Sequence, residues 1–217
     1  MKIMTYWSPV PELNMLEEFK LLLLWRENWA KAGFEPVVLN EYVARQHPYF
    51  EEFDAAVSKF PTVNPVAYEK ACFHRWLALA QVGGGTMADY DCWNRSCTVE
   101  DAEAIDLDFT TFYQRGANGV LVPCLVSAGA EDCLWLCEKF ASYVPTELDV
   151  EGQRPHLSDQ NCLQPIIKAN PGRFKCTPIV TGYGEEGWKD AKAVHFSNGS
   201  CTPLGKTPKY VHVPTLI

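Results

Sequence analysis

The beginning of the chain alternates between two short apolar runs and one long amphipathic stretch. The run "KIMTYW" at residues 2–7 is closed by "SPVP", and "EPVVLN" at residues 35–40 is a second short run, so both are typical of buried strands. Between them, from residue 14 to residue 32, apolar side chains recur at helical spacing, and Gly33 follows as a natural helix end. This strand–helix–strand order predicts an α/β fold, in which helices cover a central sheet.

The remainder of the chain continues this alternation less regularly. Residues 41–64 predict short helices and loops, because prolines interrupt the apolar pattern. A longer helix is predicted from Pro65 to the glycines at residues 83–85, and a strand "TMADYD" is predicted after them. Later strands are expected in "NGVLVPCLVS", "CTPIVTG" and "KAVHFS", and later helices in "EDCLWLCEKFASYV" and "LSDQNCLQPIIKAN". With 217 residues and no internal repeat or linker, we expect a single domain over residues 1–217.

Composition and charge restrict the classes of partner. The formal net charge is -8, whereas proteins that bind phosphate backbones normally carry a basic face, so nucleic acid is disfavoured and a small molecule is favoured. The longest apolar run, residues 21–25, is far shorter than the roughly 20 residues of a membrane span. The first residues lack the apolar core of a signal peptide. We therefore expect a cytoplasmic protein without a membrane span.

The chain contains nine cysteines. The number is odd, no Cys-x-x-Cys pair occurs, and no secretory signal precedes them, so a disulfide framework is disfavoured. Free cysteine behaves as a small apolar residue, which predicts buried, reduced thiols. A structural zinc site is the alternative.

Two aspartates, Asp89 and Asp91, end the strand predicted after the glycines. In a regular strand, side chains two residues apart share one face, so the two carboxylates would repel each other unless a cation lies between them. Mg²⁺ or Mn²⁺ removes this conflict, and such ions commonly link carboxylates to substrate phosphates. A solvated turn is the alternative, because residues 106–108 form a second Asp-x-Asp in this acidic chain.

The segment around these acids resembles the DXD region of glycosyltransferases with the GT-A fold. That family pattern is approximately Ala-Asp-x-x-Arg, an apolar helix, and Gly-Gly-x-Tyr-x-Asp-x-Asp, and this chain has "ACFHRWLALAQVGGGTMADYD". Arg75, Asp89 and Asp91 fall in register without an insertion. Cys72 stands where the family usually has aspartate, and Met87 where it usually has tyrosine. The first departure concerns the acidic contact to the donor sugar, and the metal motif is unchanged.

Three further segments extend the resemblance to nearly the whole chain. "HLSDQNCLQ" resembles the helix start that faces the sugar in many retaining members, and "AVHFSNGSCTPLGK" resembles a late segment that returns a histidine to the metal and a lysine to the diphosphate. "MTYWSPVP" resembles a first strand with aromatic residues near the nucleobase. The resemblance implies a GT-A-like single domain with a mixed, mostly parallel sheet flanked by helices. Residues 1–95 would be a Rossmann-like half that binds the nucleotide sugar, and residues 96–217 an acceptor-side half with the C-terminal metal and diphosphate segment.

The resemblance also implies a role for individual side chains. Asp89, Asp91 and His195 would bind Mn²⁺ or Mg²⁺, which neutralises the departing diphosphate. Asp159 and Gln160 would be the catalytic pair that faces the sugar and stabilises its oxocarbenium character. The residues implied to contact the donor nucleotide, including its phosphates, ribose or base, are Tyr6, Trp7, Arg75, Asp89, Tyr90 and Lys206.

Most of these residues also have an ordinary structural interpretation. His195 could be a hydrogen-bonded core histidine, and Lys206 a solvated charge. Asp159 could be a helix N-cap, although Ser158 could cap the same helix equally well. The aromatic pair Tyr6 and Trp7 could belong to the core.

We expect a metal-dependent glycosyltransferase that moves a sugar from a nucleoside-diphosphate donor to a hydroxyl acceptor. UDP is the default donor nucleotide of the family, and GDP is the alternative. A glycan is the first expectation for the acceptor, and retention is favoured only by the Asp-Gln resemblance. Two alternatives stay open. One is a catalytically degenerate module that binds a nucleotide sugar or glycan. The other is a phosphotransferase with an Asp-x-Asp nucleophile, which would normally place that pair after an early strand.

Overall fold

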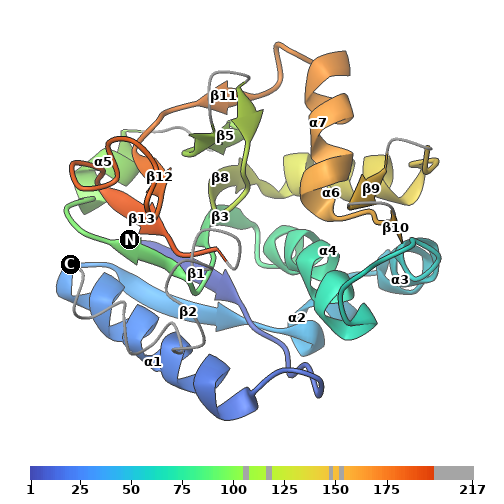
Figure 1. Cartoon of the computed structure of the whole chain (residues 1–217), viewed down its shortest axis with the longest axis horizontal. Helices are drawn as coiled ribbons and strands as arrows, with labels where there is room; N and C mark the ends of the chain where they lie inside the picture. Colours follow the sequence, from blue (N-terminus) through green and yellow to red (C-terminus); the bar gives the residue numbers. More distant parts are fainter. Residues whose placement is uncertain (105–107, 116–118, 147–148, 152–153, 198–217) are drawn as a thin grey trace.

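The computed structural model describes residues 1–104, 108–115, 119–146, 149–151 and 154–197. At its centre is a six-stranded sheet with helices on both faces (Figure 1). The helices are α1 (Met15–Lys31), α2 (Glu41–Arg45), α3 (Phe50–Val57), α4 (Val66–Gln81), α5 (Val99–Glu103), α6 (Ala130–Ala141) and α7 (Asp159–Ala169). The central strands, in chain order, are β1 (Lys2–Tyr6), β2 (Glu35–Leu39), β3 (Gly84–Ala88), β5 (Thr110–Thr111), β8 (Leu125–Gly129) and β11 (Lys175–Cys176).

The central sheet is mixed, and its strand order is β11-β5-β8-β3-β1-β2. β1 is parallel to both of its neighbours, β2 and β3, whereas β8 is antiparallel to β3 and β5. β11 is parallel to β5 at the other edge. The predicted α/β class is thus confirmed, and the predicted strand–helix–strand opening corresponds to β1, α1 and β2.

Smaller sheets complete the structure. A three-stranded sheet has the order β12-β13-β4, with β12 at Val180–Gly182, β13 at Ala193–His195 and β4 at Cys92–Asn94. Two antiparallel pairs lie in the second half of the chain: β6 (Gln114–Arg115) with β7 (Val120–Leu121), and β9 (Val150–Glu151) with β10 (Arg154–Pro155).

Two hydrophobic layers cover the two faces of the central sheet. Successive strand residues point to opposite faces, so Met4 and Met87 pack on one side, whereas their neighbours Ile3 and Ala88 pack on the other. The first layer is closed mainly by α4 and α6, and the second by α1 and the three-stranded sheet. The two layers hold the strand ends in fixed positions, and these strand ends carry the site described below.

The glycines that end α4 do more than form a turn. Gly84 and Gly85 have positive φ values of 83° and 134°, and both belong to β3. A Cβ on Gly84 would lie 2.5 Å from the carbonyl oxygen of Ala128 on β8, and a Cβ on Gly85 would lie 2.4 Å from Cε of Met4 on β1. Glycine at these positions therefore allows β3 to lie between its two neighbouring strands.

The cysteines in the described part of the chain are all free thiols, and most of them are buried. This agrees with the expectation of reduced core residues; Cys201 lies outside the described residues. None of the helices built from the described residues is long and apolar enough to cross a membrane.

Candidate functional site

Asp89 and Asp91 lie in the turn that connects the central sheet to the three-stranded sheet. β3 ends at Ala88, and the backbone N–H of Cys92 donates to the carbonyl oxygen of Asp89 over 2.8 Å, which closes a four-residue turn. The N–H of Asp89 in turn donates to the carbonyl of Cys124 over 2.7 Å. The expectation that the two acids belong to the strand is therefore wrong. The turn, and not the pleat of a strand, brings both carboxylates to the same side.

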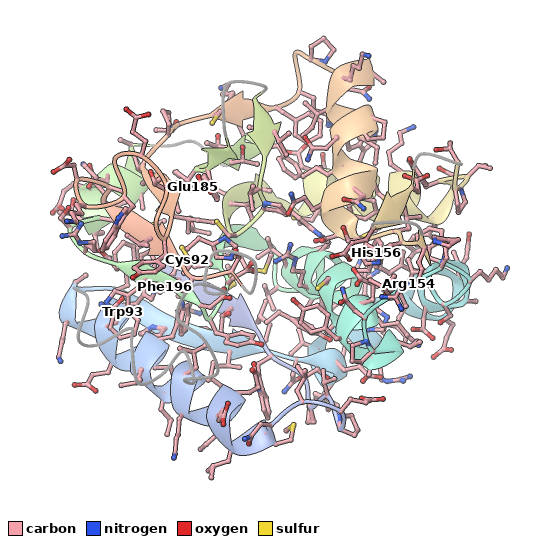
Figure 2. The ribbon with its side chains drawn as sticks, viewed as in Figure 1. Cys92, Trp93, Arg154, His156, Glu185 and Phe196 are labelled. Atoms are coloured by element: carbon pink, nitrogen blue, oxygen red, sulfur yellow. The ribbon has the colours of Figure 1, made fainter. Side chains whose placement is uncertain are left out.

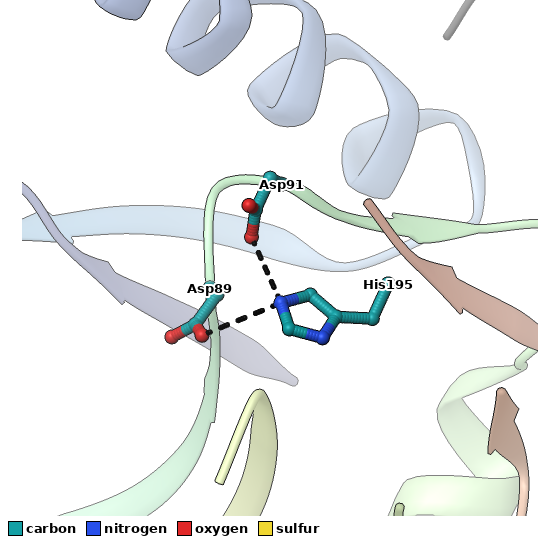
Figure 3. Close-up of side chains that lie close together, drawn as sticks. All are labelled: Asp89, Asp91 and His195. Carbon is teal, nitrogen blue, oxygen red and sulfur yellow. Dashed lines mark ion pairs between the residues drawn. The ribbon is translucent and has the colours of Figure 1, made fainter. Parts of the chain in front are cut away.

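Strand pairing brings His195 to these two acids. β13 runs antiparallel to β4 with His195 opposite Cys92, and the N–H of Phe196 donates to the carbonyl of Asp91 over 2.9 Å. The imidazole Nε2 then lies 3.3 Å from Oδ1 of Asp91 and 3.9 Å from Oδ2 of Asp89 (Figure 3).

These three residues fit a divalent metal ion. Within the described residues, Asp89, Asp91 and His195 are the one group of this kind, and their potential ligand atoms all lie within 4.8 Å of one another. Ligands bound at roughly 2.1 Å in octahedral geometry stand about 3 Å apart, so small side-chain rotations bring the three atoms to ligand distances. Two carboxylate oxygens and one imidazole nitrogen suit Mn²⁺, and the oxygens also suit Mg²⁺.

Burial and mutual repulsion govern the electrostatics of this group. Burial raises the pKa of Asp89; Arg75 opposes this shift, and the neighbouring Asp91 adds to it. Burial lowers the pKa of His195, but the surrounding Cys124 and Asp91 outweigh it and hold that pKa well above its ordinary value. A divalent cation at this position would favour the ionised form of both carboxylates.

Arg75 connects the acid pair to a third carboxylate. This residue of α4 is 7% exposed, and its Nη1 lies 2.5 Å from Oδ1 of Asp89. On its other side, Nη2 and Nε donate to Oδ2 of Asp159 over 2.5 and 3.1 Å. The planar fork of arginine can hold two carboxylates at once. Arg75 therefore fixes the spacing between the metal group and the start of α7.

The start of α7 shows which of two adjacent residues is the helix cap. Oγ of Ser158 accepts from the N–H of Asn161 over 3.1 Å, so Ser158 is the N-cap. This leaves the carboxylate of Asp159 for Arg75 and for Trp76, whose Nε1 donates to the same Oδ2 over 2.9 Å. Gln160 is half-buried beside it and lines the same cavity.

The predicted donor-contacting aromatic residues lie at the end of β1 and in the acidic turn. Tyr6 is buried and Trp7 half-buried, and the ring of Trp7 meets Phe19 of α1 edge-on at a centroid distance of 6.3 Å. Tyr90 donates its hydroxyl to the carboxylate of Glu18, so this contact anchors the turn to α1. All three predicted aromatic residues line the cavity. Lys206 lies outside the described residues.

One cavity of about 340 Å³ brings the predicted residues together. It opens where β1 and β3 end, which is the usual position of ligands in open α/β sheets, and its volume falls in the range of small-molecule sites. Its lining comes mainly from α4, the ends of β1 and β3, the start of α7 and β13, with additional residues from loops and β9: Tyr6, Trp7, Ser8, Val10, Asn64, Tyr68, Glu69, Ala71, Cys72, Arg75, Asp89, Tyr90, Asp91, Val122, Pro123, Glu151, His156, Ser158, Asp159, Gln160, His195 and Ser197.

Several lining residues have no role assigned from the sequence. Glu69 is 4% exposed and shares the cavity wall with Cys72 and Arg75 of the same helix. His156 lies next to the paired strands β9 and β10 (Figure 2). Its Nδ1 accepts a hydrogen bond from the N–H of Val63 over 3.3 Å. The three-residue spacing of Glu69 and Cys72 places them on one side of α4, so Glu69 could be grouped with Cys72 of the motif from the sequence, although the cavity itself could not.

Comparisons with known proteins support the fold. Residues 12–102 match the model of a family described as a domain of unknown function (DUF8765). No curated protein is significantly similar to the chain in sequence. The structure is similar to the crystal structure of a glycosyltransferase involved in the glycosylation of the major capsid of PBCV-1, with a TM-score of 0.55 and 12% sequence identity. The alignment covers 99% of this chain and 100% of that one, so the similarity extends over the whole fold.

Proposed function

We propose that the protein is a metal-dependent glycosyltransferase, which transfers a sugar from a nucleoside-diphosphate donor to a hydroxyl group. The observation that carries the proposal is the group of Asp89, Asp91 and His195 in the wall of a cavity that also contains the Arg75–Asp159 ion pair. The similarity of the whole fold to a glycosyltransferase structure supports the same class of reaction. We infer UDP as the donor nucleotide and a glycan as the acceptor.

The metal end of the cavity would hold the donor diphosphate. Asp89, Asp91 and His195 would bind Mn²⁺ or Mg²⁺, and the ion would supply Lewis-acid stabilisation of the charge on the leaving diphosphate. The side chain of Arg75 orients Asp89 through its 2.5 Å ion pair, so the metal group is held before the substrate arrives. Lys206 is proposed as a further phosphate contact.

The opposite end of the Arg75 bridge would face the sugar. In the described chain, the hydrogen bonds from Arg75 and Trp76 to the Asp159 carboxylate all end on Oδ2, and we propose that Oδ1 faces the sugar. We assign Asp159 and Gln160 to stabilisation of positive charge on the sugar, with retention of configuration. Tyr6 and Trp7 would contact the nucleobase. Residues 1–95 would then bind mainly the donor, and residues 96–217 would complete the acceptor side.

A thermal-shift panel tests the proposal. Nucleoside diphosphates and nucleotide sugars are added with Mn²⁺, Mg²⁺ or a chelator, because a ligand that binds the native state raises the melting temperature. We expect a shift with one nucleotide series that requires the metal. Absence of any shift in a folded sample would contradict the proposal, and a shift without turnover would favour a binding module.

A further inference from the structure

Glu69 is a buried carboxyl group in the cavity, and the metal group does not use it. It is 4% exposed and lies on α4 six residues before Arg75. At a helical rise of about 1.5 Å per residue, this places its Cα roughly 9 Å along the helix axis from that of Arg75. The charged neighbours that act on Glu69 are Asp159 and Arg75, so Glu69 belongs to the Asp159 side of the cavity wall.

Two neutral donors hold the carboxyl group of Glu69. Nδ2 of Asn64 donates to Oε2 over 2.9 Å, and Oγ1 of Thr62 donates to the same oxygen over 3.4 Å. Thr62 is itself fixed by the N–H of Asn64, which donates to its Oγ1 over 2.9 Å. Within the described residues, both hydrogen bonds to Glu69 thus end on Oε2. The second oxygen, Oε1, is the one available to a ligand.

The charge environment of Glu69 suits a neutral ligand and disfavours an anionic one. Burial raises the pKa of Glu69 to about 7, and the nearby Asp159 acts in the same direction. The positive charge of Arg75 lowers this pKa from a distance, since the ion pairs of its guanidinium group are with Asp89 and Asp159. A phosphate group would be repelled at this position, whereas a hydroxyl group can donate to a carboxylate or accept from a carboxylic acid.

The side chain next to Glu69 leaves room for such a ligand. Cys72 lies one helical turn further along α4, is half-buried and lines the same cavity. Burial raises the pKa of its thiol well above the ordinary value, so Cys72 is neutral. A small neutral thiol between Glu69 and the Arg75–Asp159 pair adds no charge and fills little space.

We propose that Glu69 binds a hydroxyl group of the transferred sugar and thereby selects which sugar the protein accepts. This inference rests on the proposed function, because it places the diphosphate at the metal group and the sugar along α4 towards Glu69. If Glu69 had only a structural role, its hydrogen bonds with Asn64 and Thr62 would hold the loop before α4 in place. The two roles differ in their effect on ligand binding.

The test compares nucleotide sugars with the free nucleoside diphosphate. Dissociation constants are measured by calorimetry in Mn²⁺ for UDP, GDP and their common hexose and N-acetylhexosamine conjugates, with the wild type, Glu69→Gln and Glu69→Ala. We expect Glu69→Ala to weaken binding of the preferred nucleotide sugar about ten- to a hundredfold, the loss of a hydrogen bond to a charged group, while binding of the diphosphate changes less than about twofold. Glu69→Gln preserves the size of the side chain and should give a smaller loss in the same direction.

Two controls sharpen the comparison. Glu151→Ala removes a carboxyl group that lines the same cavity, but its side chain is 63% exposed, and we expect no change in the preference for sugar over diphosphate. Donor analogues that each lack one sugar hydroxyl identify the contact. Removal of the relevant hydroxyl should weaken binding to the wild type, but should have little further effect in Glu69→Ala.

The outcomes separate this inference from the proposed function. Equal weakening of nucleotide sugar and diphosphate in Glu69→Gln would indicate a structural role and overturn the inference. Unchanged binding of the nucleotide sugar, with a loss only of sugar transfer to the acceptor, would also overturn the inference. If the wild type binds none of these compounds in Mn²⁺, the proposed function itself fails.

Discussion

Arg75 holds Asp89 and Asp159 at the two ends of one guanidinium group, with 2.5 Å between the nearest atoms on each side. The carboxylate in the metal group and the carboxylate at the start of α7 are therefore fixed relative to each other by a single side chain. Because the arginine and both acids lie in the cavity wall, we expect this side chain to affect both stability and ligand binding.

Replacement of Arg75 by alanine should lower the free energy of unfolding by roughly 3–5 kcal/mol, because it leaves the buried carboxylate of Asp159 and the half-buried carboxylate of Asp89 without their cation. Chemical denaturation at neutral pH measures the loss. Lys31→Ala is the matched control, since its ion pair with Glu27 is exposed and should contribute less than about 1 kcal/mol. A loss for Arg75→Ala as small as that of the control would refute the bridging role.

Substitution of Asp89 or Asp91 by asparagine should weaken Mn²⁺ binding at least about tenfold, because each change removes one charged oxygen ligand. Titration calorimetry or Mn²⁺ paramagnetic resonance measures the affinity, and circular dichroism checks the fold. Asp108→Asn, which changes the exposed last residue of the second Asp-x-Asp, is the control and should bind Mn²⁺ as the wild type does. Equal affinities in all variants would place any metal elsewhere.

The variant Gly84→Ala should be destabilised by at least about 2 kcal/mol, because the position has φ 83° and the new Cβ would lie 2.5 Å from a backbone oxygen of β8. Gly172→Ala, where no atom lies within 4 Å of the added Cβ, is the control. Both are compared by thermal and urea unfolding. Similar stability of the two variants would show that β3 can move away from β8 at little cost.

Glu69 predicts a pH dependence of stability. Burial, followed by Asp159, raises its pKa from 4.5 to about 7, while Asn64, Thr62 and Arg75 oppose the shift. The native state then holds more protons than the unfolded state between these pH values, so stability decreases as pH rises through this window. Relative to Glu69→Gln, the wild type should lose at most about 3 kcal/mol from pH 4.5 to 7 and no more above it. A constant difference across this window would argue against a buried titrating carboxyl.

Local sequence patterns predicted the layered α/β fold well. Alternating apolar periods of strands and helices are local properties, and β1, α1, β2 and α4 form where those periods occur. Patterns could not decide the conformation of Asp89 and Asp91, because a strand end and a tight turn contain the same residue types. The turn depends on the hydrogen bond from Cys92 and on the pairing of β4 with the distant β13.

The candidate site depended still more on contacts between distant segments. Ser158 and Asp159 are both good helix caps, and the choice between them follows from Arg75, which is 84 residues away from Asp159. The position of His195 follows from strand pairing, which a single sequence does not encode locally; only the family resemblance indicated it. For Glu69, the sequence showed a polar residue on an apolar helix, but not that this side of α4 lines a cavity.

The most direct test of the central claim is the release of nucleoside diphosphate from nucleotide sugars by the purified protein, measured with Mn²⁺, with a chelator, and with Mn²⁺ added back. We predict slow, metal-dependent cleavage of one donor in water, faster cleavage with a hydroxyl acceptor, and loss of both in Asp91→Asn. Cleavage that persists in the chelator or in Asp91→Asn, or no cleavage of any donor by a protein that binds them, would contradict the account.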